Sequence, residues 1–159
     1  MTEEGPGLDL YDANGNLRAS LGVSAEGPAL RLWDAMTEQG LSLMVDKDGP
    51  VVCLREVKGN TGVMVTAGKV GPAICLSDAN GKHRLILDVS PFESGTPGLT
   101  MRNANGMATV VVRTLEDGPS VGLFDPANEH GNTAVRLQVD SDGPSLRCLK
   151  DGKVLWSAT

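Results

Sequence analysis

The chain has 159 residues, of which 40% are hydrophobic and only 3% aromatic, and its formal net charge is −6. The length suits one domain, and the acidic charge argues against nucleic acid or an anionic membrane as the main partner, because both attract basic faces. No stretch approaches the ~20 apolar residues of a membrane-spanning helix, which excludes membrane insertion by such a helix.

A repeat that opens with Gly-Pro runs through the chain. The first four copies are spaced 22 residues apart. Self-similarity at this period indicates one supersecondary unit that is tiled along the sequence, so we expect a single repeat domain over residues 5–159. With Thr96-Pro97 counted as a degenerate copy, the seven starts are Gly5-Pro6, Gly27-Pro28, Gly49-Pro50, Gly71-Pro72, Thr96-Pro97, Gly118-Pro119 and Gly143-Pro144.

Each start is followed by two apolar residues that are separated by one other residue. Side chains two apart share one face of a strand, so this alternation predicts a half-buried strand in every unit. We expect each Pro to stand at the first position of its strand, where a missing N–H is tolerated. In chain order, the apolar pairs are Leu8 and Leu10, Leu30 and Leu32, Val52 and Leu54, Ile74 and Leu76, Leu99 and Met101, Val121 and Leu123, and Leu146 and Cys148.

A turn and a return strand complete each unit. Asp12-Ala13-Asn14-Gly15 and Asp78-Ala79-Asn80-Gly81 are typical of hairpin turns, because the Asp side chain can accept backbone hydrogen bonds and Gly adopts a positive φ. The return strands carry the same alternation, for example at Ala19, Leu21 and Val23. We therefore predict an all-β fold of seven tandem β-hairpin repeats, with about 14 antiparallel strands in a meander.

One face of this meander is Leu and Val in every unit and has to be covered. The favoured solution is a homotrimer, in which each chain forms one wall of a β-prism, because regular repetition creates a self-complementary surface. A monomeric β-solenoid or a sandwich remains the alternative. The predicted oligomer core consists of Leu10, Leu32, Leu54, Leu76, Met101, Leu123, Leu21, Leu43, Val65, Leu87, Val112 and Leu137.

Departures from the repeat are the candidate binding positions. Two turns are lengthened, one with Phe92 near its tip and one that contains His130. Tyr11 and Trp33 follow the second apolar residue of their strands and would lie on the outward face, where a glycan could stack. The simpler interpretation is that these aromatic side chains pair across strands and cover the surface of the sheet.

No pattern in the sequence indicates catalysis, and we expect no cofactor and no enzyme. His83 and His130 lack partners at metal-ligand spacing, and no nucleophile motif is present. Acidic residues before the turns and the arginines Arg18 and Arg84 are expected to pair on solvated surfaces. In a flat meander Cys53 and Cys75 would lie roughly two strand spacings, ~9.6 Å, apart, too far for a disulfide, so we expect free thiols.

The unit that begins Gly5-Pro6 and continues through Tyr11-Asp12-Ala13-Asn14-Gly15 resembles a β-hairpin repeat found in uncharacterised bacterial proteins. The closing segment Asp151-Gly152-Lys153-Val154-Leu155-Trp156-Ser157-Ala158 is also similar to the ends of those chains. The resemblance implies an oligomeric stalk-and-head arrangement, in which a membrane segment and a coiled coil precede the repeats. It implies no catalytic residues.

Taken together, these patterns favour a non-enzymatic structural or scaffold protein that self-assembles through its apolar sheet face. The alternative is a carbohydrate- or surface-binding module that uses Tyr11, Trp33, Phe92 and His130, with a glycan or a protein as its partner. The start Met1-Thr2-Glu3-Glu4 has no signal-peptide pattern, so we expect a cytoplasmic protein, or a surface-associated one if a signal or anchor was removed.

Overall fold

A computed structural model describes residues 5–34, 40–55, 61–90, 95–125 and 134–159. These residues form 14 β-strands, which confirms the predicted all-β class. Within those ranges we find no helix with the length and apolar character that crossing a bilayer requires. The strands are β1 (Gly7–Tyr11), β2 (Leu17–Ser24), β3 (Gly27–Trp33), β4 (Gly40–Asp46), β5 (Gly49–Arg55), β6 (Thr61–Gly68), β7 (Gly71–Ser77), β8 (His83–Ser90), β9 (Thr96–Arg102), β10 (Ala108–Leu115), β11 (Gly118–Phe124), β12 (Ala134–Asp140), β13 (Gly143–Lys150) and β14 (Lys153–Ala158).

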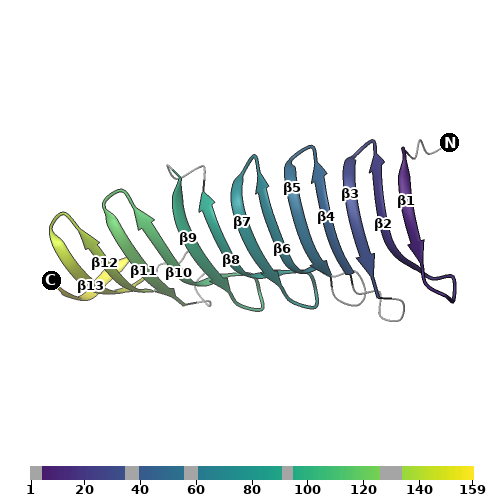
Figure 1. Cartoon of the computed structure of the whole chain (residues 1–159). Helices are drawn as coiled ribbons and strands as arrows, with labels where there is room; N and C mark the ends of the chain where they lie inside the picture. Colours follow the sequence, from purple (N-terminus) through teal and green to yellow (C-terminus); the bar gives the residue numbers. More distant parts are fainter. Residues whose placement is uncertain (1–4, 35–39, 56–60, 91–94, 126–133) are drawn as a thin grey trace. The chain divides into compact units, whose positions relative to one another are not determined.

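The chain divides into two units, which we call unit 1 (Met1–Lys82) and unit 2 (His83–Thr159). Unit 1 holds β1 to β7 and unit 2 holds β8 to β14, and in each the strand order follows the chain (Figure 1). Every recorded strand pair within a unit is antiparallel and joins strands that are consecutive in the sequence. The predicted antiparallel meander is confirmed, and its pairing differs from that of a solenoid, whose successive coils stack in parallel.

Asp and Asn side chains build the turns at one end of the hairpins. Asp12 Oδ1 accepts hydrogen bonds from the backbone N–H groups of Asn14 and Asn16, at 2.9 and 3.0 Å. Asp78 and Asn103 make the same pair of contacts in their own turns. These contacts satisfy backbone donors that the strand ladder leaves open, so the turn residues fix where each hairpin reverses.

The Gly-Pro dipeptide lies at the other end of the hairpins. The position of the glycine requires a positive φ and no side chain, and the position of the proline requires no backbone N–H. Gly27 has a φ of +123°, and a Cβ placed on it would overlap the carbonyl oxygen of Val45 on β4. Pro28 is the second residue of β3, not the first as predicted. It pairs with Val23 on β2, and the ladder between β3 and β4 begins only at the next residue, Ala29. The missing proline N–H therefore costs no ladder hydrogen bond.

Side chains alternate between two faces of each unit. The apolar face carries the Leu and Val pairs of every strand, and the opposite face, which we call the polar face, carries mostly small, polar and charged residues. Among the described residues no large side chain is fully buried. The buried positions on the polar face include Ala29, Ser42, Cys53 and Cys75, all of them small. Each unit is thus a single layer without a conventional core, and its large apolar side chains stay partly in contact with water.

Candidate functional site

The apolar face of unit 1 is built from two rows of side chains that cross all seven strands. Each residue of a row is paired with the residue directly opposite it on the next strand. The strand register thereby keeps the leucines and valines on the same face from β1 to β7. The first row is Leu8, Leu21, Leu30, Leu43, Val52, Val65 and Ile74. The second row is Leu10, Ala19, Leu32, Leu41, Leu54, Val63 and Leu76.

Unit 2 repeats this arrangement on its own sheet. The first row is Leu87, Leu99, Val112, Val121, Leu137, Leu146 and Ala158. The second row is Leu85, Met101, Val110, Leu123, Val135, Cys148 and Trp156. No ionisable carboxylate, amine or guanidinium interrupts either row, so each unit presents a continuous apolar surface.

The structure places every predicted oligomer-core residue on the apolar face of its own unit. Their exposed fractions lie between 37% for Val112 and 54% for Leu10. Monomeric soluble proteins rarely leave so continuous an apolar surface in water, which makes these rows the candidate functional surface. The full set is Leu10, Leu32, Leu54, Leu76, Met101, Leu123, Leu21, Leu43, Val65, Leu87, Val112 and Leu137.

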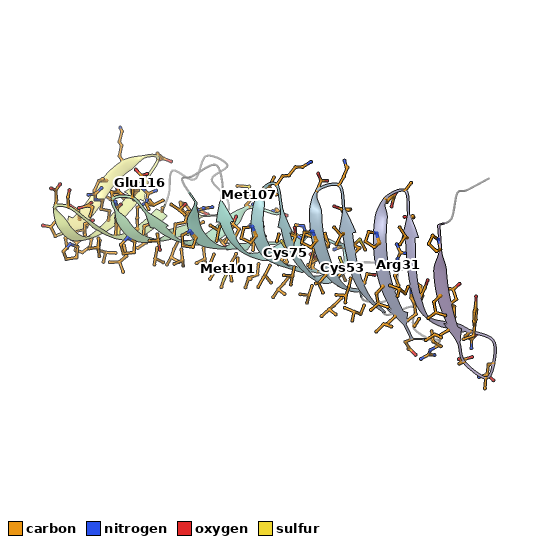
Figure 2. All side chains as sticks on the ribbon, turned by 45° about the horizontal axis from the view of Figure 1, so that its top comes forward. Arg31, Cys53, Cys75, Met101, Met107 and Glu116 are labelled. Atoms are coloured by element: carbon orange, nitrogen blue, oxygen red, sulfur yellow. The ribbon has the colours of Figure 1, made fainter. Side chains whose placement is uncertain are left out.

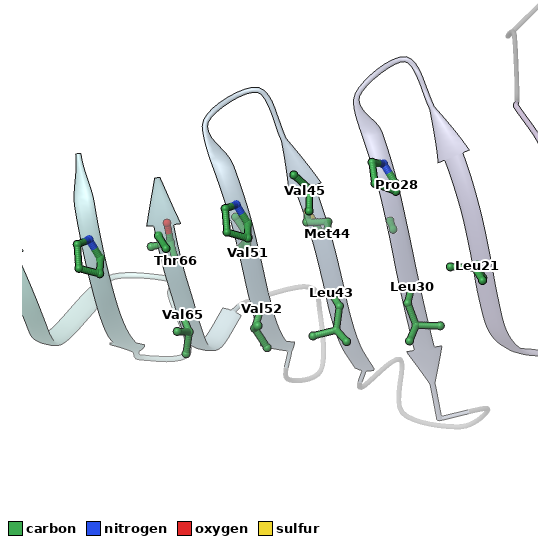
Figure 3. Close-up of a pocket in the computed structure, with 14 residues that line it drawn as sticks. Leu21, Pro28, Leu30, Leu43, Met44, Val45, Val51, Val52, Val65 and Thr66 are labelled. Carbon is green, nitrogen blue, oxygen red and sulfur yellow. The ribbon is translucent and has the colours of Figure 1, made fainter. Parts of the chain in front are cut away.

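A shallow apolar groove of about 570 Å³ follows the first row of unit 1. Figure 3 shows Leu21, Leu30, Leu43, Val52 and Val65, each from a successive strand, as part of its lining. Proline rings near the Gly-Pro end of the hairpins line it as well. The lining residues carry no charged side chain, and Thr66 supplies the one hydroxyl among them, so the groove offers mainly shape and apolar contact to apolar side chains.

The predicted aromatic binding residues lie on the polar face. Tyr11 is 60% exposed, and its hydroxyl donates a long, 3.5 Å hydrogen bond to Asp9 Oδ2. Trp33 is half-buried and lies beside Gly40, where an added Cβ would be 3.4 Å from the Trp33 Cδ1 atom. Strand β2 separates the two aromatic residues. Phe92 and His130 lie outside the described residues.

Charged side chains pair around the first turn of unit 1. Arg18 lies 3.8 Å from Asp12 and 3.9 Å from Asp34, which supports the predicted pairing of acidic and basic positions. Hydrogen bonds from the side chain and backbone of Asn16 and from the backbone of Asn14, together with the charge of Arg18, lower the pKa of Asp12. Arg84 donates a hydrogen bond to the backbone carbonyl of Asn103. The turn thus holds a carboxylate that is stabilised in its charged form.

Cys53 and Cys75 are buried on the polar face of unit 1, and neither is in a disulfide (Figure 2). Met64 of β6 pairs with both of them, so one whole strand separates the two thiols. This spacing is the one that the sequence predicts to be too long for a disulfide. The described residues also contain no group of three His, Cys, Asp or Glu side chains that could hold a metal ion.

Sequence reasoning did not single out a group of arginines on the polar face of unit 2. Arg113, Arg136 and Arg147 come from β10, β12 and β13. Their position relative to one another depends on strand register, which the repeat indicates only once the hairpins are aligned. The signal that could have revealed them is clearest for Arg136, because the equivalent positions of other units hold only uncharged residues, namely Ser20, Ser42, Met64, Ile86 and Val111.

Comparison with known proteins adds no functional assignment. No family model matches the chain, and the search of curated proteins finds no similar sequence. The geometry of the two sheet faces therefore carries the functional inference.

Proposed function

We propose that this chain is a non-enzymatic structural repeat protein that self-assembles through its apolar face. The observation that carries the proposal is the unbroken double row of half-exposed Leu and Val side chains on each unit. Completing the burial of one such side chain contributes about 1 kcal/mol. Over the twelve predicted core residues the gain is on the order of 10 kcal/mol, comparable with the ~4–15 kcal/mol that association costs in lost freedom.

The favoured assembly is a homotrimer in which three apolar faces turn inward as the walls of a prism. A closed ring of identical chains covers the same surface on every copy, and a symmetric arrangement brings equivalent rows together. The polar face, with its charged residues and turns, would then form the outside.

Mass in solution tests this proposal. Light scattering behind size-exclusion chromatography is expected to give about 50 kDa, three times the 16.6 kDa of one chain. The Leu43→Glu variant places a charge in the first row and should lower the mass, whereas Ser20→Glu on the polar face should not. A stable wild-type monomer at micromolar concentration would rule the proposal out.

A second candidate function is glycan or surface binding by the aromatic residues of the polar face. The exposure of Tyr11, at 60%, is the observation that favours it. A glycan array probed with the wild type and with Trp33→Ala is the test. Binding that is absent, or equal in the two proteins, removes this function.

A further inference from the structure

Strand register brings two arginines of unit 2 directly opposite each other on the polar face. Arg136 of β12 pairs with Arg147 of β13, and on its other side it pairs with Gly122 of β11. Like charges that are directly opposed destabilise an antiparallel sheet. Arg113 of β10 adds a third guanidinium group on the same face, opposite Ser120. This concentration of positive charge stands out in a protein whose formal net charge is −6, and an anion held beside the pair would relieve the repulsion.

A hollow of about 250 Å³ lies on the β10–β12 side of this pair, where Arg136 lines it. Its lining includes Arg113, Arg136, Gln138 and the ring of Phe124. The ring occupies the space above Gly122, because a Cβ added to that glycine would lie 2.6 Å from Phe124 Cε2. The missing side chain at Gly122 therefore allows an aromatic ring to lie back over its own strand, next to the guanidinium groups.

Gln138 lines the hollow, and Ser145 lies on the next strand, outside the lining. Gln138 Nε2 donates a hydrogen bond to Asp117 Oδ2 at 3.1 Å, which orients the amide. Ser145 pairs with Gln138 across β12 and β13 and is only 5% exposed. Its hydroxyl oxygen is buried without a hydrogen-bond partner. Buried polar atoms are rarely left in this state, so the polar face is unusual at Ser145 as well as at the arginine pair.

We propose that this hollow binds an anionic sugar residue. Arg136 and Arg113, which both line the hollow, hold its acidic group, since guanidinium groups form strong charge-assisted hydrogen bonds with carboxylate and sulfate oxygens. The apolar face of the sugar ring lies against Phe124, and its hydroxyls reach Gln138. The hollow combines one aromatic surface with a few convergent polar groups, as small-molecule sites do. It opens on the polar face, so covering the apolar face leaves it accessible, and the site does not rest on self-assembly.

Isothermal titration calorimetry of the intact chain tests the site with three disaccharides of equal length. The ligands are digalacturonate, a sulfated disaccharide and a neutral disaccharide, with inorganic sulfate as a fourth titrant. Binding of either acidic disaccharide, with none of the neutral one, is the expected result, and the preference between the two identifies the acidic group. Equal binding of the neutral disaccharide, inorganic sulfate that binds as tightly as the sugar, or no binding of any acidic disaccharide overturns the proposal.

Two variants and one matched control locate the binding. Arg136→Gln and Phe124→Leu are each expected to weaken binding at least tenfold. Arg31→Gln is the control, because Arg31 lies on the polar face of unit 1 at the strand position equivalent to Arg147, opposite Ser20 and Ser42. Arg136→Gln should also unfold at a urea concentration no lower than the wild type, since it removes a like-charge contact. Unchanged affinity in a folded Arg136→Gln protein would place any binding elsewhere and refute the assignment.

Discussion

The close approach of some Gly-Pro glycines to a neighbouring strand leads to a specific stability prediction. Gly118 has a φ of +129°, and a Cβ on it would overlap the carbonyl oxygen of Val139 on β12. Gly143 occupies the same place in the next repeat, with a φ of +111°, but nothing lies within 4 Å of its added Cβ. The two glycines therefore share the backbone conformation and differ in the close approach.

Gly143→Ala should cost only the strain of a positive φ, about 1 kcal/mol. Gly118→Ala should cost this strain plus a backbone overlap, for a total of about 3 kcal/mol. Because the overlapping atom belongs to the backbone, it cannot move aside as a flexible side chain would, and β11 and β12 would have to separate locally.

The measurement is urea unfolding followed by far-ultraviolet circular dichroism, with all proteins at one concentration. At a typical slope of ~1–3 kcal/mol per molar urea, a difference of about 2 kcal/mol moves the midpoint by about 1 M. Equal losses in the two variants would refute the reasoning, because they would show that conformation alone, without the approach to Val139, explains why glycine is required.

The other predictions concern charge, thiols and assembly. Because the pKa of Asp12 is lowered in the fold, its stabilising effect should be complete above pH ~4 and be lost as the pH falls through the lowered pKa, so thermal melts of wild type and Asp12→Asn should converge in acid. Cys53 and Cys75, at 6% and 5% exposure, should react with a thiol reagent far more slowly in native protein than in urea; equal rates would contradict their burial. Cys148 lies in the second row of the apolar face, so Leu43→Glu, which should lower the mass, should also accelerate its modification.

Local patterns were enough to predict most of the fold. Alternation at Leu30 and Leu32 placed their strand, and the turn that begins at Asp12 was recognised because Asp and Gly serve turns in a known way. Pro28 was predicted at the first position of its strand and lies at the second. The sequence does not show at which residue a strand begins to pair with each of its two neighbours. A periodic sequence also does not show what covers its apolar face.

The candidate sites were less predictable, for a physical reason. The apolar rows follow directly from a period of two, so the twelve predicted core residues could be placed on the apolar faces of the two units. The opposition of Arg136 and Arg147 depends instead on the register of β12 and β13, and the position of Phe124 depends on the absence of a side chain at Gly122. Such relations between strands produce no short-range periodicity in the sequence.

Pairing only between consecutive strands makes the length of the protein adjustable. Among the described residues of unit 1, strand pairing joins only consecutive strands, so excising the 22 residues from Gly27 to Asp48 would join Glu26 to Gly49 and re-create the same type of junction. Repeat arrays of this kind gain or lose stability in increments, one neighbour interface at a time. Duplication or loss of whole hairpins would therefore lengthen or shorten the sheet and keep the pairing pattern of the remaining strands. Evolution can thus change the length of the protein without changing the sequence of the individual repeats.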